Sequence, residues 1–206
     1  MTVRVDELQI ADPSQVWTGA GFSVDSDAVC RVGGVRIRLG GRGAGIVGWS
    51  LSGAPSDSQD LDGIPTTWST PVSAAPAAHA NGVTAIDHVV LMSPDLSRTV
   101  AALAAVGAAR RRERDAELGG QAIRQVFFRL GEVILEVVGS PDTAADGPSR
   151  LWGITFEVAD IDATAAYFGD RTTPVKDAVQ PGRRITTLRH RDLRMSVPTA
   201  MISARH

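Results

Sequence analysis

FRLGEVILEVVG, residues 128–139, decides the fold, because nearly the same pattern stands at residues 30–41, CRVGGVRIRLGG. Arginine, glycine and valine match between the two copies, and each copy predicts two short strands around a glycine-containing turn. The stretches upstream also correspond, since VDELQIADPSQVW at 5–17 and IDHVVLMSPDLSRTV at 86–100 both predict a strand that runs into a helix. Recurrence of this whole order indicates repeated units.

The end of the chain contains a further copy. WGITFEVADID at 152–162 aligns with DHVVLMSPDLS at 87–97, and it predicts a strand followed by a helix that begins after Asp160 and ends at Gly169. Three more strands are expected near 173–177, 185–189 and 198–203. A complete unit is therefore β-α-β-β-β, and one such unit is too small to fold well alone.

Three regions follow from the repeat. Residues 1–55 form a partial unit with an appended strand, because GIVGWSLSGA at 45–54 resembles RLWGITFEVA at 150–159. Residues 56–84 are rich in Ser, Pro, Ala and Gly, which predicts a linker. Residues 85–206 hold two complete units, 85–139 and 150–203.

Composition narrows the function classes. The chain has 206 residues and a formal net charge of −2, so no overall field favours nucleic acid or an anionic membrane. No apolar run approaches the roughly 18 residues that span a bilayer. The single cysteine excludes an internal disulfide framework, and a cytoplasmic, reducing location is expected.

Paired β-α-β-β-β units in this order resemble the vicinal-oxygen-chelate superfamily, which includes glyoxalases, bleomycin-resistance proteins and extradiol dioxygenases. IDHVVLMSPDLSRTVAAL at 86–103 is similar to the family's opening strand, and FFRLGEVILEVV at 127–138 to its third and fourth strands. The resemblance covers residues 85–203 well and 1–55 weakly. It implies an α+β fold in which two complete βαβββ units form a cup-shaped open barrel, with one partial N-terminal unit added.

The resemblance also implies a site. In that family a His or Gln on the first strand and a Glu on the fourth strand hold a divalent metal. Here these positions are His88 and Glu136, expected as metal ligands for Zn, Ni, Fe, Mn or Co or as a catalytic acid–base pair. The matching positions of the last unit are Gly153 and Ala200, which have no ligand atoms. The metal site is therefore expected to be degenerate, and a metal-free hydrogen-bonded pair of His88 and Glu136 is the alternative.

The N-terminal unit has a glutamate and an arginine at the corresponding positions, Glu7 and Arg38, which predict an ion pair. The run ARRRERD at 109–115 predicts an exposed strand.

Substrate-binding residues are expected at the mouth of the cup. Arg184, in an arginine-rich C-terminal stretch, could hold a carboxylate or phosphate, although an exposed strand edge kept soluble by charge is the favoured explanation of this stretch. Trp152, Phe127, Phe128 and Phe156 could line an apolar pocket.

Three functions remain open. The first is a glyoxalase-like or dioxygenase-like lyase, isomerase or oxygenase that acts on a small oxygenated molecule through an enolate-like intermediate. The second is a non-enzymatic protein that binds and sequesters such a molecule, as bleomycin-resistance proteins do. The third is a structural subunit. A homodimer is one way to cover the exposed face of the unpaired N-terminal unit.

Overall fold

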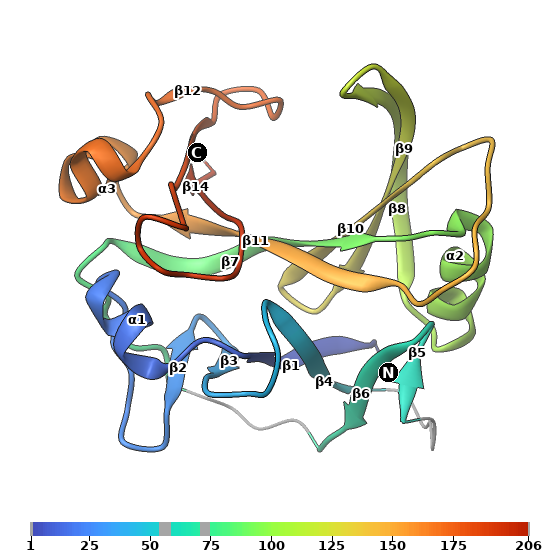
Figure 1. The fold of residues 1–206 in the computed structure, drawn as a ribbon, viewed down its shortest axis with the longest axis horizontal. Coiled ribbons are helices and arrows are strands. Elements are labelled where there is room, and N and C mark those ends of the chain that lie inside the picture. The colour runs from blue at the N-terminus through green and yellow to red at the C-terminus, as the bar shows by residue number, and fades with distance from the viewer. Residues whose placement is uncertain (1, 54–58, 71–74, 206) are drawn as a thin grey trace.

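The computed structural model describes residues 2–53, 59–70 and 75–205. It confirms the predicted α+β class, with helices and two sheets (Figure 1). The N-terminal elements are β1 (Arg4–Ile10), α1 (Ser14–Gly19), β2 (Val29–Val32), β3 (Val35–Arg38), β4 (Ile46–Ser52), β5 (Asp60–Leu61) and β6 (Ile64–Trp68). The next unit contains β7 (Val83–Met92), α2 (Leu96–Ala105), β8 (Ala109–Leu118), β9 (Gln121–Leu130) and β10 (Val133–Gly139). The last contains β11 (Arg150–Val158), α3 (Ile161–Phe168), a 3-10 turn (Gly169–Arg171), β12 (Lys176–Asp177), β13 (Arg184–Thr187) and β14 (Thr199–Ser203).

The eight-stranded sheet consists of the two complete units. Its order is β12-β13-β14-β11-β7-β10-β9-β8, so each unit has its last strand parallel to its first and the units meet at the antiparallel pair β7–β11. The sheet is open, because its edge strands are β8 and β12. Figure 1 shows β8 and β9 rising on one side of the central strands and β12 and β14 on the other. This arrangement agrees with the predicted cup.

The third helix also begins and ends as predicted. The Asp160 carboxylate accepts hydrogen bonds from the backbone N–H groups of Asp162 and Ala163, and Gly169 follows the helix with a φ of 58°.

The N-terminal sheet is more regular than the sequence indicated. Its order is β2-β3-β1-β4-β6-β5, with β3 parallel to β1, β6 parallel to β4, and β1 antiparallel to β4. The expected appended strand, β4, therefore opens a second shortened unit that β5 and β6 complete. Each of these two units has three strands where a complete unit has four.

Residues 56–84, predicted to be a linker, contain β5 and β6. The turn between these strands is Asp62-Gly63, and both residues have positive φ, 54° and 81°. Asp-Gly between extended segments is a strong hairpin signal, but the Ser- and Pro-rich composition around it favours a linker. Residues 56–58 and 71–74 of the predicted linker lie outside the described residues.

The two sheets share one hydrophobic core. Phe156 of β11 packs against Phe22 and Trp17 of the N-terminal region, with ring centroids 5.2 Å and 6.2 Å apart. One face of the N-terminal sheet is therefore covered by the eight-stranded sheet of the same chain. A second copy of the chain is not needed to cover that face, which was the expected reason for a homodimer. Cys30 is fully buried in this core, and burial raises the pKa of its thiol to about 12.

Each of the four units carries a β-bulge at the same place on its first strand. At this place the register of the antiparallel pairs leaves one residue unpaired in each of the four strands: Asp6, Val47, Asp87 and Trp152. A bulge lets two neighbouring side chains leave the strand on the same side. The residue after each bulge occupies the position that the resemblance assigns to a ligand.

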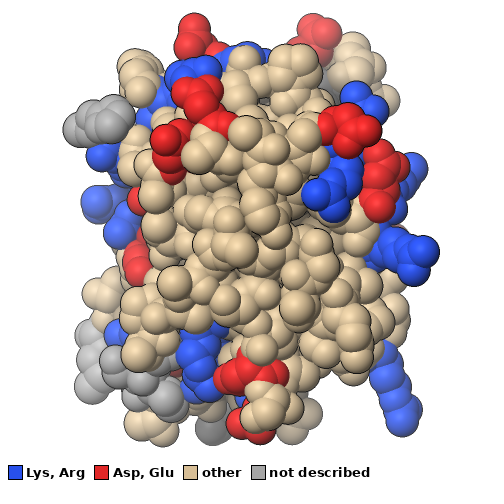
Figure 2. Space-filling view, turned by 90° about the vertical axis from the view of Figure 1, so that its left-hand side faces the viewer, with Lys and Arg blue, Asp and Glu red and all other residues tan. Residues whose placement is uncertain are grey.

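The surface adds two observations. Figure 2 shows one side of the molecule, on which charged side chains gather mainly toward the margins. No helix within the described ranges is long and apolar enough to cross a lipid bilayer.

Candidate functional site

A cavity of about 540 Å³ lies on the eight-stranded sheet and is lined by residues of both units. Glu136 and Phe127 line it, whereas their neighbours Leu135 and Phe128 point into the core. Because side chains alternate along a strand, the cavity lies on the face of the sheet opposite the N-terminal sheet. Its lining includes five arginines, two carboxylates and one imidazole.

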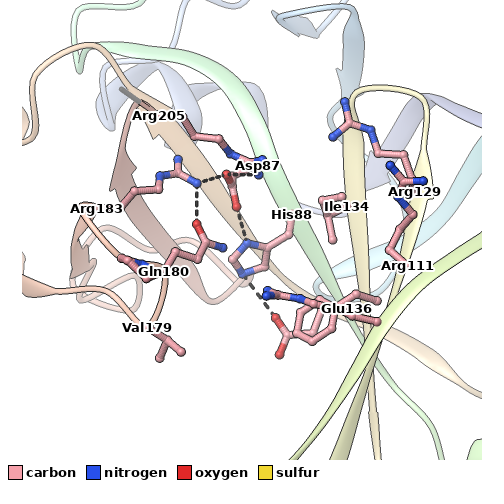
Figure 3. Close-up of a pocket in the computed structure, with 14 residues that line it drawn as sticks. Asp87, His88, Arg111, Arg129, Ile134, Glu136, Val179, Gln180, Arg183 and Arg205 are labelled. Carbon is pink, nitrogen blue, oxygen red and sulfur yellow. Dashed lines mark hydrogen bonds and ion pairs between the residues drawn. The ribbon is translucent and has the colours of Figure 1, made fainter.

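The predicted pair is at the floor of this cavity (Figure 3). Nε2 of His88 lies 3.5 Å from Oε2 of Glu136, and the side chains are 15% and 13% exposed. The two residues come from β7 and β10, which are parallel neighbours. A neutral imidazole nitrogen lone pair and an ionised carboxylate repel each other at this distance. The contact is favourable when a proton or a cation stands between the two atoms.

Asp87 fixes the other side of the imidazole. The bulge on β7 turns Asp87 to the same side as His88, and its Oδ2 lies 2.8 Å from His88 Nδ1. A carboxylate is an acceptor only, so Nδ1 carries the proton and Nε2 faces Glu136. Burial alone would raise the pKa of Asp87, but hydrogen bonds from His88 and Arg183 hold it well below its usual value.

Arg183 is the partner that holds Asp87. Its side chain is 4% exposed and also donates to the Glu157 carboxylate (3.1 Å), the Gln180 side-chain oxygen (2.6 Å) and the Ser203 carbonyl (2.7 Å). These acceptors engage all three of its nitrogens. Arg183 therefore organises one wall of the cavity.

Glu136 is held by a second chain of contacts. The Gln125 side-chain amide donates to Oε1 of Glu136, and Arg114 donates to the Gln125 oxygen from Nε at 2.9 Å. Glu136 thus presents Oε2 to His88. Both members of the central pair are oriented by side chains of their own unit.

The last unit has no ligand side chains at the positions equivalent to His88 and Glu136. Gly153 follows the bulge on β11, as His88 does on β7, and a Cβ at Gly153 would stand 2.8 Å from the Pro198 carbonyl oxygen. Ala200 takes the position of Glu136 on β14. Among the residues that the structure describes, no three His, Cys, Asp or Glu side chains gather to hold a metal ion.

The donor set therefore does not fit a resident divalent ion. Two ligand side chains are fewer than the three that catalytic sites use, and guanidinium groups surround them.

The N-terminal sheet carries the predicted ion pair at the equivalent place. Glu7 accepts from Arg38 at 3.0 Å and from Arg36 at 3.1 Å, and its side chain is 7% exposed. The Glu7 carboxylate is therefore already paired with two guanidinium groups.

The residues predicted to bind substrate lie elsewhere. Arg184 is exposed and pairs with Asp162 at 2.7 Å, Phe128 is buried in the core, and Trp152 is 46% exposed outside the cavity lining. Phe127, which was also expected to line the pocket, does line the cavity, and Arg183 lines it in place of its neighbour Arg184. Phe156, also expected to line the pocket, is buried in the core.

Other lining residues were not predicted: Asp87, Arg111, Arg112, Arg129, Gln180 and Arg205. The run at 109–115 was expected to be an exposed strand. It forms β8, and its residues 110–113 are exposed as expected, while Arg111 and Arg112 also line the mouth of the cavity.

No protein-family model matches the sequence, and no curated protein matches it. Solved structures do match. A mutant of 4-hydroxymandelate synthase from Streptomyces coelicolor has a TM-score of 0.66 at 15% identity, over 98% of this chain and 94% of that chain. A catechol 2,3-dioxygenase has a TM-score of 0.61 at 11% identity, over 98% and 89%. An extradiol ring-cleaving dioxygenase from B. fuscum has a TM-score of 0.59 at 13% identity, over 100% and 72%. Likeness at these identities concerns the fold.

Proposed function

Since this chain has the vicinal-oxygen-chelate fold, we propose that its cavity binds a small oxygenated molecule and moves a proton on it without a resident metal. His88 and Glu136 are the catalytic pair, and Asp87 positions His88. The observation that carries the proposal is the 3.5 Å contact between His88 Nε2 and Glu136 Oε2 inside a cavity that contains five arginines.

The chemistry follows from the atoms present. A substrate C–H bond beside a carbonyl breaks, the proton passes to the His88–Glu136 pair, and the electron pair moves to the carbonyl oxygen as an enolate. Guanidinium groups of the cavity stabilise the oxygen that gains charge. Return of the proton to the same or a neighbouring carbon completes an isomerisation.

A divalent metal is the competing account, because a metal between the same two atoms would also remove their repulsion. The arginines argue against it, since five guanidinium groups around two ligands repel a dication.

Two measurements on the purified chain test the proposal. Metal analysis after purification without chelator should find less than stoichiometric metal, and two-bond ¹H–¹⁵N NMR of His88 should show a proton on Nδ1. Incubation with small α-hydroxy and α-keto acids in D₂O should exchange their α-protons, and Glu136→Gln should abolish that exchange. Stoichiometric metal that is lost in His88→Ala would refute the metal-free account.

A non-enzymatic binder is the second candidate. The well-satisfied Arg183 cluster supports it, because a rigid wall suits a sequestering site. Saturable binding without α-proton exchange would favour this candidate. Calorimetry is the appropriate readout, since the cavity lining found among the described residues includes no tryptophan to report by fluorescence.

A further inference from the structure

One wall of the cavity carries three arginines from two neighbouring strands. The pairing of β8 with β9 has a register shift between Arg110 and Arg112, so Arg111 is the extra residue of a bulge. This bulge brings Arg111 and Arg112 to the cavity side together, and Arg129 of β9 lies on the same face as Phe127.

These three arginines lack carboxylate partners among the described residues. The Arg112 guanidinium stacks 4.4 Å from the centre of the Phe127 ring, and Arg129 Nε donates to the carbonyl of Gly131. No ion pair within 4 Å joins Arg111 to a residue that the structure describes. Two neighbours on the same hairpin differ, because Arg110 pairs with Glu113 and Arg124 with Asp115. The wall thus holds an excess of positive charge.

Arg111 and Arg112 are exposed and Arg129 is partly buried, so solvent screens part of the repulsion among them, and all three can be reached by a ligand. Guanidinium groups without a carboxylate partner bind carboxylate or phosphate oxygens through paired N–H donors. Two features preorganise the wall: the bulge that aims Arg111 inward and the ring that orients Arg112.

We propose that the Arg111–Arg112–Arg129 wall binds the anionic end, carboxylate or phosphate, of the molecule whose oxygenated carbon faces His88. This inference rests on the proposed function and names the substrate class. Figure 3 shows Arg111 and Arg129 on one side of His88 and Arg183 and Arg205 on the other. A ligand whose anionic end is bound by Arg111 and Arg129 therefore extends across the cavity floor toward His88 and Glu136.

Calorimetric titration of the full chain with malonate and with inorganic phosphate tests the wall. At least one anion should bind saturably, with affinity that falls as salt rises. Arg111→Met combined with Arg129→Met should weaken that binding about 10- to 100-fold. Arg110→Met is the matched control, because it removes the same charge from the same strand outside the cavity, and it should change affinity less than about twofold.

The relative affinity of the two anions identifies the chemistry of the ligand's anionic end. Absence of saturable binding for both, or equal weakening by Arg110→Met and by the double variant, would overturn the inference. The His88 proton position is measured separately, so failure of the wall leaves the acid–base proposal standing.

A second measurement on the unmodified chain covers the case in which the double variant does not fold. Arginine modification by p-hydroxyphenylglyoxal, located by mass spectrometry, should slow at Arg111 and Arg129 when the better-binding anion is present, and remain unchanged at Arg110. Equal protection at all three positions contradicts the inference.

Discussion

Asp87 and Arg183 are 96 residues apart in the sequence, yet they form an ion pair that solvent hardly reaches, with side chains 2% and 4% exposed. The pair joins the two β-α-β-β-β units across the cavity floor. Each charge has further partners, His88 for Asp87 and Glu157 for Arg183. Neither charge can be removed without leaving the other buried and undercompensated.

Arg183→Met should therefore lower the free energy of unfolding by about 3–5 kcal/mol, the usual loss when one member of a buried pair is deleted. Urea denaturation measures it. Arg184→Met is the neighbouring control, because Arg184 is exposed and pairs only with exposed Asp162, and its unfolding midpoint should not move. Equal losses in the two variants would show that the buried pair has no special weight.

Asp87→Asn should make stability less sensitive to acid. Burial opposes ionisation of Asp87, but hydrogen bonds from His88 and Arg183 lower its pKa in the folded chain. A carboxyl with a depressed folded pKa stabilises the fold above its unfolded pKa of about 4, and that contribution is lost as pH falls toward the folded value. The stability difference between wild type and variant should be constant from pH 6 to 8 and shrink below pH 4. A difference that grows in acid would contradict this sign.

Gly153 and Gly48 lie at equivalent positions of their two units, and alanine substitution tests whether crowding favours glycine there. Both follow a bulge, and an added Cβ would stand 2.8 Å from the Pro198 oxygen and 2.9 Å from the Pro65 oxygen. Alanine at either position should cost about 1–3 kcal/mol in thermal or urea unfolding, through strain in a close-packed place. Gly19→Ala, with open space around it, is the control and should be neutral. Neutral behaviour of Gly153→Ala would show that crowding is not what favours glycine there.

The internal repeat allowed the fold of the two complete units and the positions of the candidate pair to be predicted from the sequence. Transfer by position made Gly153 the equivalent of His88 and Ala200 the equivalent of Glu136. The register agrees, because Glu136 pairs with the residue two after His88 and Ala200 pairs with the residue two after Gly153. Such transfer works because homologous units share their pairing.

What the repeat could not supply was the bulges. Alternation assumes one residue per step, so an extra residue at Asp87 or Arg111 shifts which side chains face the cavity. Arg183 and Arg184 show the same limit, because the choice between them depends on a partner 96 residues away.

Asp62 should fasten the β5–β6 hairpin to the unit that contains α2. Its carboxylate accepts hydrogen bonds from the Thr99 and Ser149 hydroxyls and from Arg98 Nε at 2.5 Å. Asp62→Asn keeps a residue that tolerates positive φ but removes the charge, so it should cost about 1–3 kcal/mol and speed hydrogen exchange in β6. Arg98→Met should have a smaller effect, because Arg98 is the exposed partner. Unchanged exchange in β6 after Asp62→Asn would exclude this fastening role.

His79 should make the fold weaker as pH falls through the range near neutrality. Its Nδ1 accepts the Ser23 N–H at 3.0 Å, so the ring proton is on Nε2, which donates to the Arg31 carbonyl at 3.1 Å. Burial lowers the pKa of His79, against the opposing effect of the Arg31 carbonyl. The unfolded chain therefore binds a proton near pH 6.5 that the folded chain resists, and the free energy of unfolding decreases as pH drops below that value. His79→Asn keeps an acceptor for Ser23 and cannot titrate, so its stability should depend less on pH between 5 and 7. Chemical denaturation at a series of pH values gives both slopes, and a His79→Asn slope as steep as that of the wild type would assign the pH dependence to another group.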